Sequence, residues 1–197
     1  TRLACIRWTP TRSGEAPGTP AGVPAPTIRV ITRLRYKMDG VGWVEDRYRQ
    51  VWVLQLDTGD SVQITDAERD CGDPRWSWDG SRIAFTCANR EMDTALGHGQ
   101  IFIYHVTSGE IKPMLPDWQG ISKSPQWRAD DRAIVFAGHN NPPPVNNRIF
   151  SHIWLCDLDQ GAARELSADK DEEVGNYCVA DQRGALGNVT VKWPSGR

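Results

Sequence analysis

The sequence lacks the features that assign chains to several common protein classes. Its 197 residues hold no apolar run long enough to span a membrane and no apolar leader at the N-terminus. The formal net charge is only −2, so no excess of positive charge favours binding to nucleic acid. A hydrophobic content of 39% is enough for a packed core. We therefore expect a globular protein with neither a membrane nor a nucleic acid as partner.

Motifs of common catalytic sites are also missing. No Gly-x-Ser-x-Gly nucleophile elbow, His-Glu-x-x-His metal motif or glycine-rich phosphate loop occurs. The four histidines lie in separate parts of the chain, at His98, His105, His139 and His152. The acidic stretch 169–177 lacks the ligand spacing of a calcium loop and is typical of a solvated charge run. The sequence therefore predicts no catalytic residue, no metal and no cofactor, and it leaves the binding residues unknown.

Five cysteines are present, which is an odd number, and no Cys-x-x-Cys pair occurs. Three of them, Cys5, Cys87 and Cys156, lie in apolar runs, where a thiol behaves as a small hydrophobic group. The other two are Cys71 and Cys178. We expect free thiols rather than a disulfide framework or a metal site, and hence a reducing compartment, the cytoplasm.

The chain does contain a repeat. The stretch "GDPRWSWDGSRIAFTC" (72–87) is followed by "KSPQWRADDRAIVFAG" (123–138). Each has a proline, a tryptophan two residues later, a polar turn, an arginine and an apolar run that reaches a phenylalanine. We assign a structural role to the repeated residues Trp76 and Trp127, Asp79 and Asp130, Phe85 and Phe136, with Gly80 in the first copy alone and Trp193 in a third, incomplete copy. An arginine, Arg82 or Arg132, recurs in the two copies as well.

Each copy continues into further short apolar runs that are separated by turns with glycine, a pattern typical of β-strands. Four-stranded units that repeat at about 40–50 residues are the blades of a β-propeller. We expect an all-β fold, a partial β-propeller of about three four-stranded blades that starts and ends within a blade. The whole chain, 1–197, would be one propeller fragment. Its units would be 1–67 (an incomplete blade with a long insert), 74–116, 125–167 and 174–197 (the start of a further blade).

Three long connections interrupt these units, at 9–27, 89–99 and 139–151. All three fall between the second and third strands of their units, so we expect them on one face of the ring. Insertions confined to one face often mark a binding face. Tolerated surface loops explain them equally well.

Laid out in this way, the chain resembles the propeller domain of the prolyl oligopeptidase superfamily, in its acylaminoacyl-peptidase branch. The pattern "P-x-W-S-x-D-G-x-x-I-A-F" at 74–85 is shared with TolB-like propellers. The segment 31–65, with "YKMDGVG" and a closing "VQIT", is similar to the peptidase branch, as is "EEVGNYCVADQRG" at 172–184. Within the first of these segments, Arg33, Arg35 and Asp39 have no role that the sequence assigns.

The resemblance implies a function for the parent polypeptide. In that family the propeller breaks no bonds but covers a downstream α/β-hydrolase domain, whose Ser-Asp-His triad acts on short peptides or acyl-peptides. No triad position has a counterpart here, so the chain itself is expected not to be an enzyme. Its expected partners are that hydrolase domain, a peptide substrate and, through open blade edges, further copies of itself.

Two other hypotheses stay open. A TolB-like propeller would stand alone as a protein-binding scaffold and would be exported to the periplasm. A propeller enzyme, such as a lyase or a glycan-acting enzyme, would need carboxylates and histidines that converge on the ring face.

Overall fold

The computed structural model describes residues 1–10, 37–38, 42–43, 47–88, 99–142, 151–167, 176–180 and 185–189. Within these ranges the chain forms strands and turns, with no helix and hence none that could cross a membrane. All strand pairs in these ranges are antiparallel. Within each sheet, the strands lie side by side in the order in which they follow along the chain.

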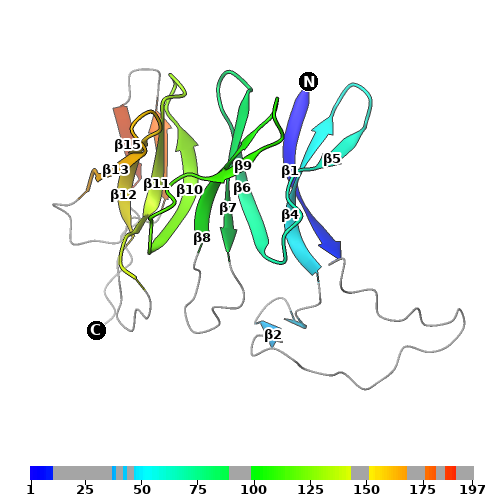
Figure 1. Ribbon diagram of the computed structural model, residues 1–197, viewed down its shortest axis with the longest axis horizontal. Helices are drawn as coiled ribbons and strands as arrows, with labels where there is room; N and C mark the ends of the chain where they lie inside the picture. Colours follow the sequence, from blue (N-terminus) through cyan, green and yellow to red (C-terminus); the bar gives the residue numbers. More distant parts are fainter. Residues whose placement is uncertain are drawn as a thin grey trace, which may run out of the picture.

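Three larger sheets stand side by side (Figure 1). The first sheet has three strands, β1 (Arg2–Pro10), β4 (Arg47–Gln55) and β5 (Ser61–Gln63). The second has four, β6 (Asp70–Trp76), β7 (Arg82–Ala88), β8 (Gly99–His105) and β9 (Ile111–Pro113). The third also has four, β10 (Ile121–Trp127), β11 (Ala133–His139), β12 (His152–Asp157) and β13 (Ala162–Glu165).

Two smaller pairs of strands complete the described structure. Strand β2 (Lys37–Met38) pairs with β3 (Gly42–Trp43), and β14 (Asn176–Ala180) pairs with β15 (Ala185–Val189). The start of a further blade was expected at 174–197, and the two strands β14 and β15 lie within that range. Trp193 lies outside the described residues.

The turns explain why each sheet folds as a meander. The connection between the last two strands of each larger sheet carries a glycine in the left-handed region, Gly59 (φ 78°), Gly109 (φ 73°) or Gly161 (φ 64°). Glycine accepts this conformation without steric cost. Four-stranded meanders that repeat side by side confirm the predicted fold class, an all-β partial propeller. The boundaries expected between the units stay predictions.

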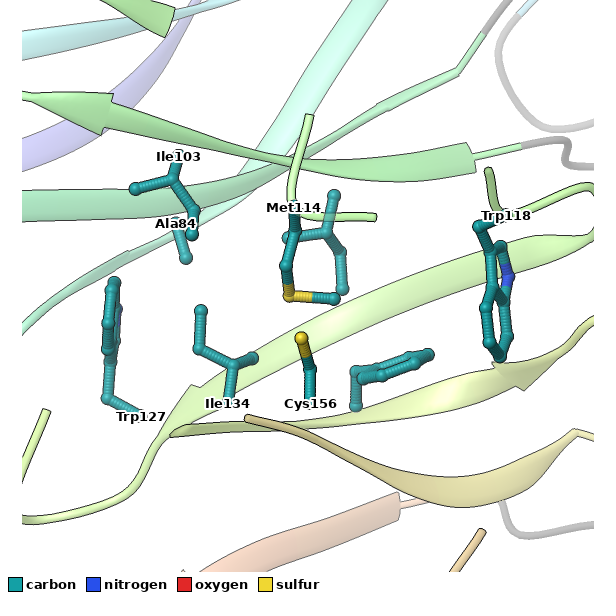
Figure 2. Packing of buried hydrophobic residues seen from close by; sticks show 9 residues of the cluster. Ala84, Ile103, Met114, Trp118, Trp127, Ile134 and Cys156 are labelled. Atoms are coloured by element: carbon teal, nitrogen blue, oxygen red, sulfur yellow. The ribbon is translucent and has the colours of Figure 1, made fainter. Parts of the chain in front are cut away.

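The hydrophobic cores lie between neighbouring sheets, because strand side chains alternate between the two faces. On β7, Ile83 and Phe85 pack toward the first sheet with Val51, while Ala84 packs toward the third. Figure 2 shows the core between the second and third sheets, where Met114 meets residues of β10, β11 and β12. Its members are Ala84, Ile101, Ile103, Met114, Trp118, Trp127, Ile134, Phe136 and Cys156.

One repeated residue was aligned wrongly from the sequence. The amide of Val106 donates to the carbonyl of Ser81, and the amide of Leu158 donates in the same way to Arg132. Arg132 therefore occupies the position of Ser81, and Ala133 occupies that of Arg82. Arg82 stands six residues after its tryptophan but Arg132 only five, a difference that the likeness of the two sequences hides.

The expectation that all cysteines are free thiols was also wrong. Cys71 and Cys87 form a disulfide between β6 and β7. The register of these strands places the two residues directly opposite each other, although they are 16 residues apart in sequence. Cys5 and Cys156 are free. The cysteines thus no longer favour a reducing compartment, and a cytoplasmic location stays a prediction.

Peptide mapping under non-reducing conditions tests this assignment. We expect Cys71 and Cys87 in one linked peptide pair, and alkylation of Cys5 before Cys156 in the native state. Burial raises the pKa of the Cys156 thiol to about 11, so very little reactive thiolate is present at neutral pH. Complete alkylation of Cys71 and Cys87 without a reductant would show that the pair is not joined.

Candidate functional site

The long connections all leave the sheets at one end, which we call the loop end. They run from Pro10 to Arg47, from Ala88 to Gly99 and from His139 to His152, in each case between the second and third strands of a unit. In Figure 1 the ends of β1 and β7 and the start of β8 lie at the same lower edge. A rigid set of strands that presents several long connections on one face is a common arrangement for a binding surface.

The described part of the loop end is held by hydrogen bonds. His139 is only 8% exposed, and its Nδ1 accepts a hydrogen bond from the backbone N–H of Asn141 at 3.3 Å. The Oδ1 atom of Asn140 accepts another from the backbone N–H of Gln119 at 2.9 Å. His139 thus belongs to the packed framework of this end and is poorly placed to serve as a surface ligand.

The histidines do not converge. His152 Nδ1 contacts the carboxylate of Glu165 on the neighbouring strand, with both side chains about a quarter exposed. His139 ends β11 at the loop end of the third sheet, whereas His105 ends β8 at the other end of the second sheet. His98 lies outside the described residues. Across the ranges that the structure describes, no group of three or more histidines, cysteines and carboxylates could hold a metal ion.

The opposite end of the sheets, the turn end, carries the repeated polar turns. In the second sheet, the Asp79 carboxylate accepts hydrogen bonds from Ser77 Oγ at 2.6 Å and from the N–H and Oγ of Ser81 at 2.9 and 2.8 Å. These bonds hold the pKa of Asp79 down at about 2. Gly80 follows with φ of 69°.

The low pKa of Asp79 predicts a dependence of stability on pH. Since the pKa in the folded state lies below the unfolded value of about 4, the stabilisation is complete above pH 4 and is lost as the pH falls toward 2. Urea unfolding between pH 5 and 2 should show that wild type exceeds Asp79→Asn in stability at pH 5 and that the gap narrows toward pH 2. Asp117→Asn, at an exposed aspartate outside this network, supplies the control. A gap that does not change with pH would contradict the assignment.

The equivalent turn of the third sheet differs in a way that the sequence did not reveal. Asp131 replaces Gly80 and keeps the left-handed conformation, with φ of 57°. Its carboxylate reaches across to the second sheet and accepts hydrogen bonds from the backbone N–H groups of Trp78 and Asp79, both at 2.8 Å. Asp130 instead pairs with Arg128 at 2.6 Å within its own turn, and this bond lowers the pKa of Asp130 to about 2.

An arginine and a tryptophan join the first sheet to the second and the second sheet to the third, a contact that we call the Arg–Trp clasp. The Arg82 guanidinium lies 4.7 Å from the centre of the Trp127 ring and donates a hydrogen bond to the Asp131 carbonyl at 2.6 Å. Arg2 lies 4.9 Å from the Trp76 ring and donates to the Gly80 carbonyl at 3.2 Å. A cation over an indole face is a favourable contact.

The other repeated residues fill the cores. Phe85 and Phe136 are 1% and 0% exposed, each on the second strand of its sheet. Trp127 is 5% exposed. Those repeated residues that the structure describes therefore lie in the contacts between sheets and at the turn end, away from the long connections.

Asp131 offers a test of these contacts. Asp131→Gly should relieve roughly 1 kcal/mol of backbone strain but remove two hydrogen bonds to a carboxylate that is 9% exposed, each worth about 1.5 to 3 kcal/mol. We therefore expect the free energy of unfolding, measured in urea, to fall by about 2 to 5 kcal/mol. Asp130→Gly, at the exposed neighbouring aspartate, should cost less. Greater stability of Asp131→Gly than of wild type would show that strain outweighs the bonds.

Comparison with known proteins finds one relative among curated sequences. No family model matches the chain. A curated relative, the uncharacterized peptidase YuxL of Bacillus subtilis, is 35% identical over 105 residues, which are 53% of this chain and 15% of that protein. The chain thus spans a small part of the relative's length.

Two solved structures extend the comparison. An acylaminoacyl peptidase of Pyrococcus horikoshii matches 92% of this chain and 26% of its own chain, with a TM-score of 0.62 and 14% identity. TolB from Acinetobacter baumannii matches 73% of this chain and 38% of its own, with a TM-score of 0.48 and 14% identity, which is too weak to bear on function. The chain is a partial β-propeller with the fold of a segment of an acylaminoacyl peptidase and with sequence similarity to a bacterial peptidase.

Proposed function

We propose that this chain is the propeller segment of a serine peptidase and that it covers and gates an α/β-hydrolase domain of the same polypeptide. That domain would act on short peptides or acyl-peptides. The propeller would break no bonds itself. It would limit which substrates reach the hydrolase domain by their size.

The observation that carries this proposal is the 35% identity over 105 residues to a curated peptidase. Identity at this level extends well beyond the short repeat around Trp76 and Trp127, which many propellers share. The match to 92% of the chain in a solved acylaminoacyl peptidase supports the same architecture.

The arrangement of the sheets supports a gating role. The cores between sheets are tightly filled, as Phe85 and Phe136 show, and the turn end is fixed by Arg–Trp clasps. A framework of this rigidity can hold a narrow passage open to short peptides and closed to folded proteins.

Substrate length is the decisive variable for gating. We would measure turnover of acetylated peptides of increasing length by the full natural polypeptide and by its Arg82→Ala variant, which loses one clasp. We expect turnover of short peptides, little of long ones, and a relative gain for long peptides in the variant. Arg132→Ala is the matched control, since its guanidinium is exposed and lies 3.8 Å from the exposed Asp159 carboxylate.

Three results would contradict the proposal. Equal turnover of short and long peptides by the wild-type polypeptide would argue against gating. Peptide hydrolysis by residues 1–197 alone would show that the propeller itself is catalytic. Absence of any hydrolase activity in the natural polypeptide would favour a stand-alone scaffold.

A further inference from the structure

The disulfide lies at the loop end of the second sheet. Cys71 is the second residue of β6 and Cys87 is the last but one of β7, and the strand register places them directly opposite each other. One residue after Cys87, β7 ends at Ala88, where the connection to Gly99 begins. The bond therefore ties two strand ends together at the place where a long connection leaves the sheet.

The third sheet shows that this strand pairing does not require the bond. The two sheets share one register, and Ser122 stands opposite Gly138 where Cys71 stands opposite Cys87. A close approach of the strands takes the place of the bond there, because a Cβ on Gly138 would lie 1.9 Å from the carbonyl oxygen of Ile121. The two cysteines are thus an addition of the second sheet, and their role is a separate question from the fold.

The strand ends beside the disulfide lack a full set of hydrogen bonds. Thr86 comes directly before Cys87, and its buried Oγ1 atom has no hydrogen-bond partner within the described structure. A buried hydroxyl without a partner favours the opening of its surroundings to water. In the third sheet the equivalent residue is Ala137, which is 1% exposed and carries no such group. Without the disulfide, this end of the second sheet would open more easily than that of the third.

The disulfide also restrains the neighbouring sheet. Cys71 and Cys87 pack with Val51 in the core between the first and second sheets. Asp70, next to Cys71, accepts a hydrogen bond from the backbone N–H of Arg49 on β4 at 2.9 Å. Since the loop end of β4 lies close to Arg49, the bond steadies strand ends from which two of the long connections run.

We propose that the Cys71–Cys87 disulfide is a redox-sensitive latch for the loop end. In the oxidised form it holds the end of β6 on β7. In the reduced form these strand ends open more often, and discrimination against long peptides weakens. This second consequence rests on the proposed function, whereas the first does not. The reductant is a dithiol, the chemical class of the active sites of thiol–disulfide oxidoreductases.

The exchange with a dithiol proceeds in two balanced steps. When the end of β7 opens, a reductant thiolate attacks the Sγ atom of Cys87, which at 7% exposure is more accessible than Cys71 at 0%. The S–S bond breaks, Cys71 leaves as a thiolate and takes up a proton, and a mixed disulfide forms on Cys87. The second thiol of the reductant then displaces Cys87, which is protonated, and the reductant leaves as a disulfide. Two electrons and two protons have passed to the protein, and oxidation of the facing thiols restores the bond.

The position of the bond favours a latch over a permanent staple. Permanent disulfides are typical of oxidising compartments, whereas those of reducing compartments are usually transient or redox-sensing. Here the bond joins strand ends rather than the middle of a sheet. Cys5 and Cys156, the other cysteines with described side chains, are free thiols. The described part of the chain therefore has no framework of disulfides to which this bond would belong.

Hydrogen exchange of the full natural polypeptide tests the latch. Exchange would be followed by mass spectrometry before and after treatment with dithiothreitol, with reduction of the bond verified by alkylation and peptide mapping. We expect peptides from β6 and β7 to exchange about tenfold faster or more after reduction. Peptides from β10 and β11, which no disulfide joins, should change by less than about twofold.

Cysteine variants supply the matched comparison. The double variant Cys71→Ala and Cys87→Ala should exchange as fast as the reduced wild type and should not respond to dithiothreitol. Cys5→Ala removes a free thiol and keeps the disulfide, so it should respond as the wild type does. If the double variant fails to fold, the wild type before and after reduction still decides the question.

The outcomes separate this inference from the proposed function. A bond that dithiothreitol leaves intact in the folded polypeptide is a permanent staple, and this result would overturn the latch. Equal exchange before and after verified reduction would overturn it as well. Under the proposed function, the ratio of turnover of long to short acetylated peptides should rise on reduction of the wild type but not of the double variant. Faster exchange with an unchanged ratio, or without any hydrolase activity, would support the latch while rejecting the gating role.

Discussion

Gly138→Ala is expected to abolish the third sheet as a stable unit. A Cβ atom at this position would lie 1.9 Å from the carbonyl oxygen of Ile121 on the paired strand β10 and 2.9 Å from its carbonyl carbon. Both atoms are backbone, so no side chain can move aside, and β10 and β11 would have to separate. Overpacking in a core usually costs about 1 to 3 kcal/mol and sometimes more. Since this contact is with the backbone, we expect the free energy of unfolding, measured in urea, to fall by at least about 3 kcal/mol.

Gly72→Ala is the matched control on the second sheet. A Cβ there would meet only the Cδ1 atom of Ile6, at 3.6 Å, which is an ordinary contact. We expect the free energy of unfolding to change by no more than about 1 kcal/mol. Alanine makes the unfolded chain less flexible than glycine does, and this effect favours the folded state. If Gly138→Ala unfolded at the same urea concentration as Gly72→Ala, the close packing of β10 on β11 would be wrong.

Phe136→Ala is expected to produce the largest loss among the core variants. Phe136 is fully buried between the second and third sheets, where its ring lies edge-on to Trp118 at 5.3 Å and stacked with Trp154 at 6.5 Å. Removal of a buried phenylalanine side chain costs about 3 to 5 kcal/mol, because a cavity remains. The loss in free energy of unfolding would be measured by calorimetry or by unfolding in urea.

Trp78→Ala provides the comparison on the surface. Trp78 is 71% exposed in the turn of the second sheet, so its removal should change the stability of residues 1–197 by no more than about 0.5 kcal/mol. A loss with Trp78→Ala as large as with Phe136→Ala would contradict the placement of the core between the sheets.

The fold could be predicted because its signals are local. Short apolar runs, turn glycines such as Gly109 and Gly161 and a tryptophan repeated at a fixed spacing all specify strands and turns within one unit. The positions of the long connections followed from the same count of strands. The last two strands, β14 and β15, were harder to predict, because they lack the repeat around tryptophan that marks the second and third sheets.

The features that sequence reasoning missed all depend on pairing between distant residues. The Cys71–Cys87 disulfide follows from the register of β6 on β7, which a spacing of 16 residues does not reveal. The role of Asp131 depends on the neighbouring sheet, because its carboxylate binds the backbone of Trp78 and Asp79. The loss of glycine from the second turn was visible, and an aspartate in its place was a signal for a left-handed residue with a polar contact.

Binding residues stay the least defined part of the candidate site. His139 is buried in the framework, and His152 pairs with Glu165 within one sheet. No signal in the sequence identified either arrangement in advance, because both depend on which side chains meet across strands.

The most direct test of the central claim uses the native polypeptide that contains this chain. A lysate of the source cells would be treated with a fluorophosphonate probe, which labels activated serines, and the protein would be captured with an antibody against residues 1–197. The account predicts a labelled band longer than this chain, as expected for a propeller joined to a serine hydrolase domain. A captured band that carries no label would contradict it.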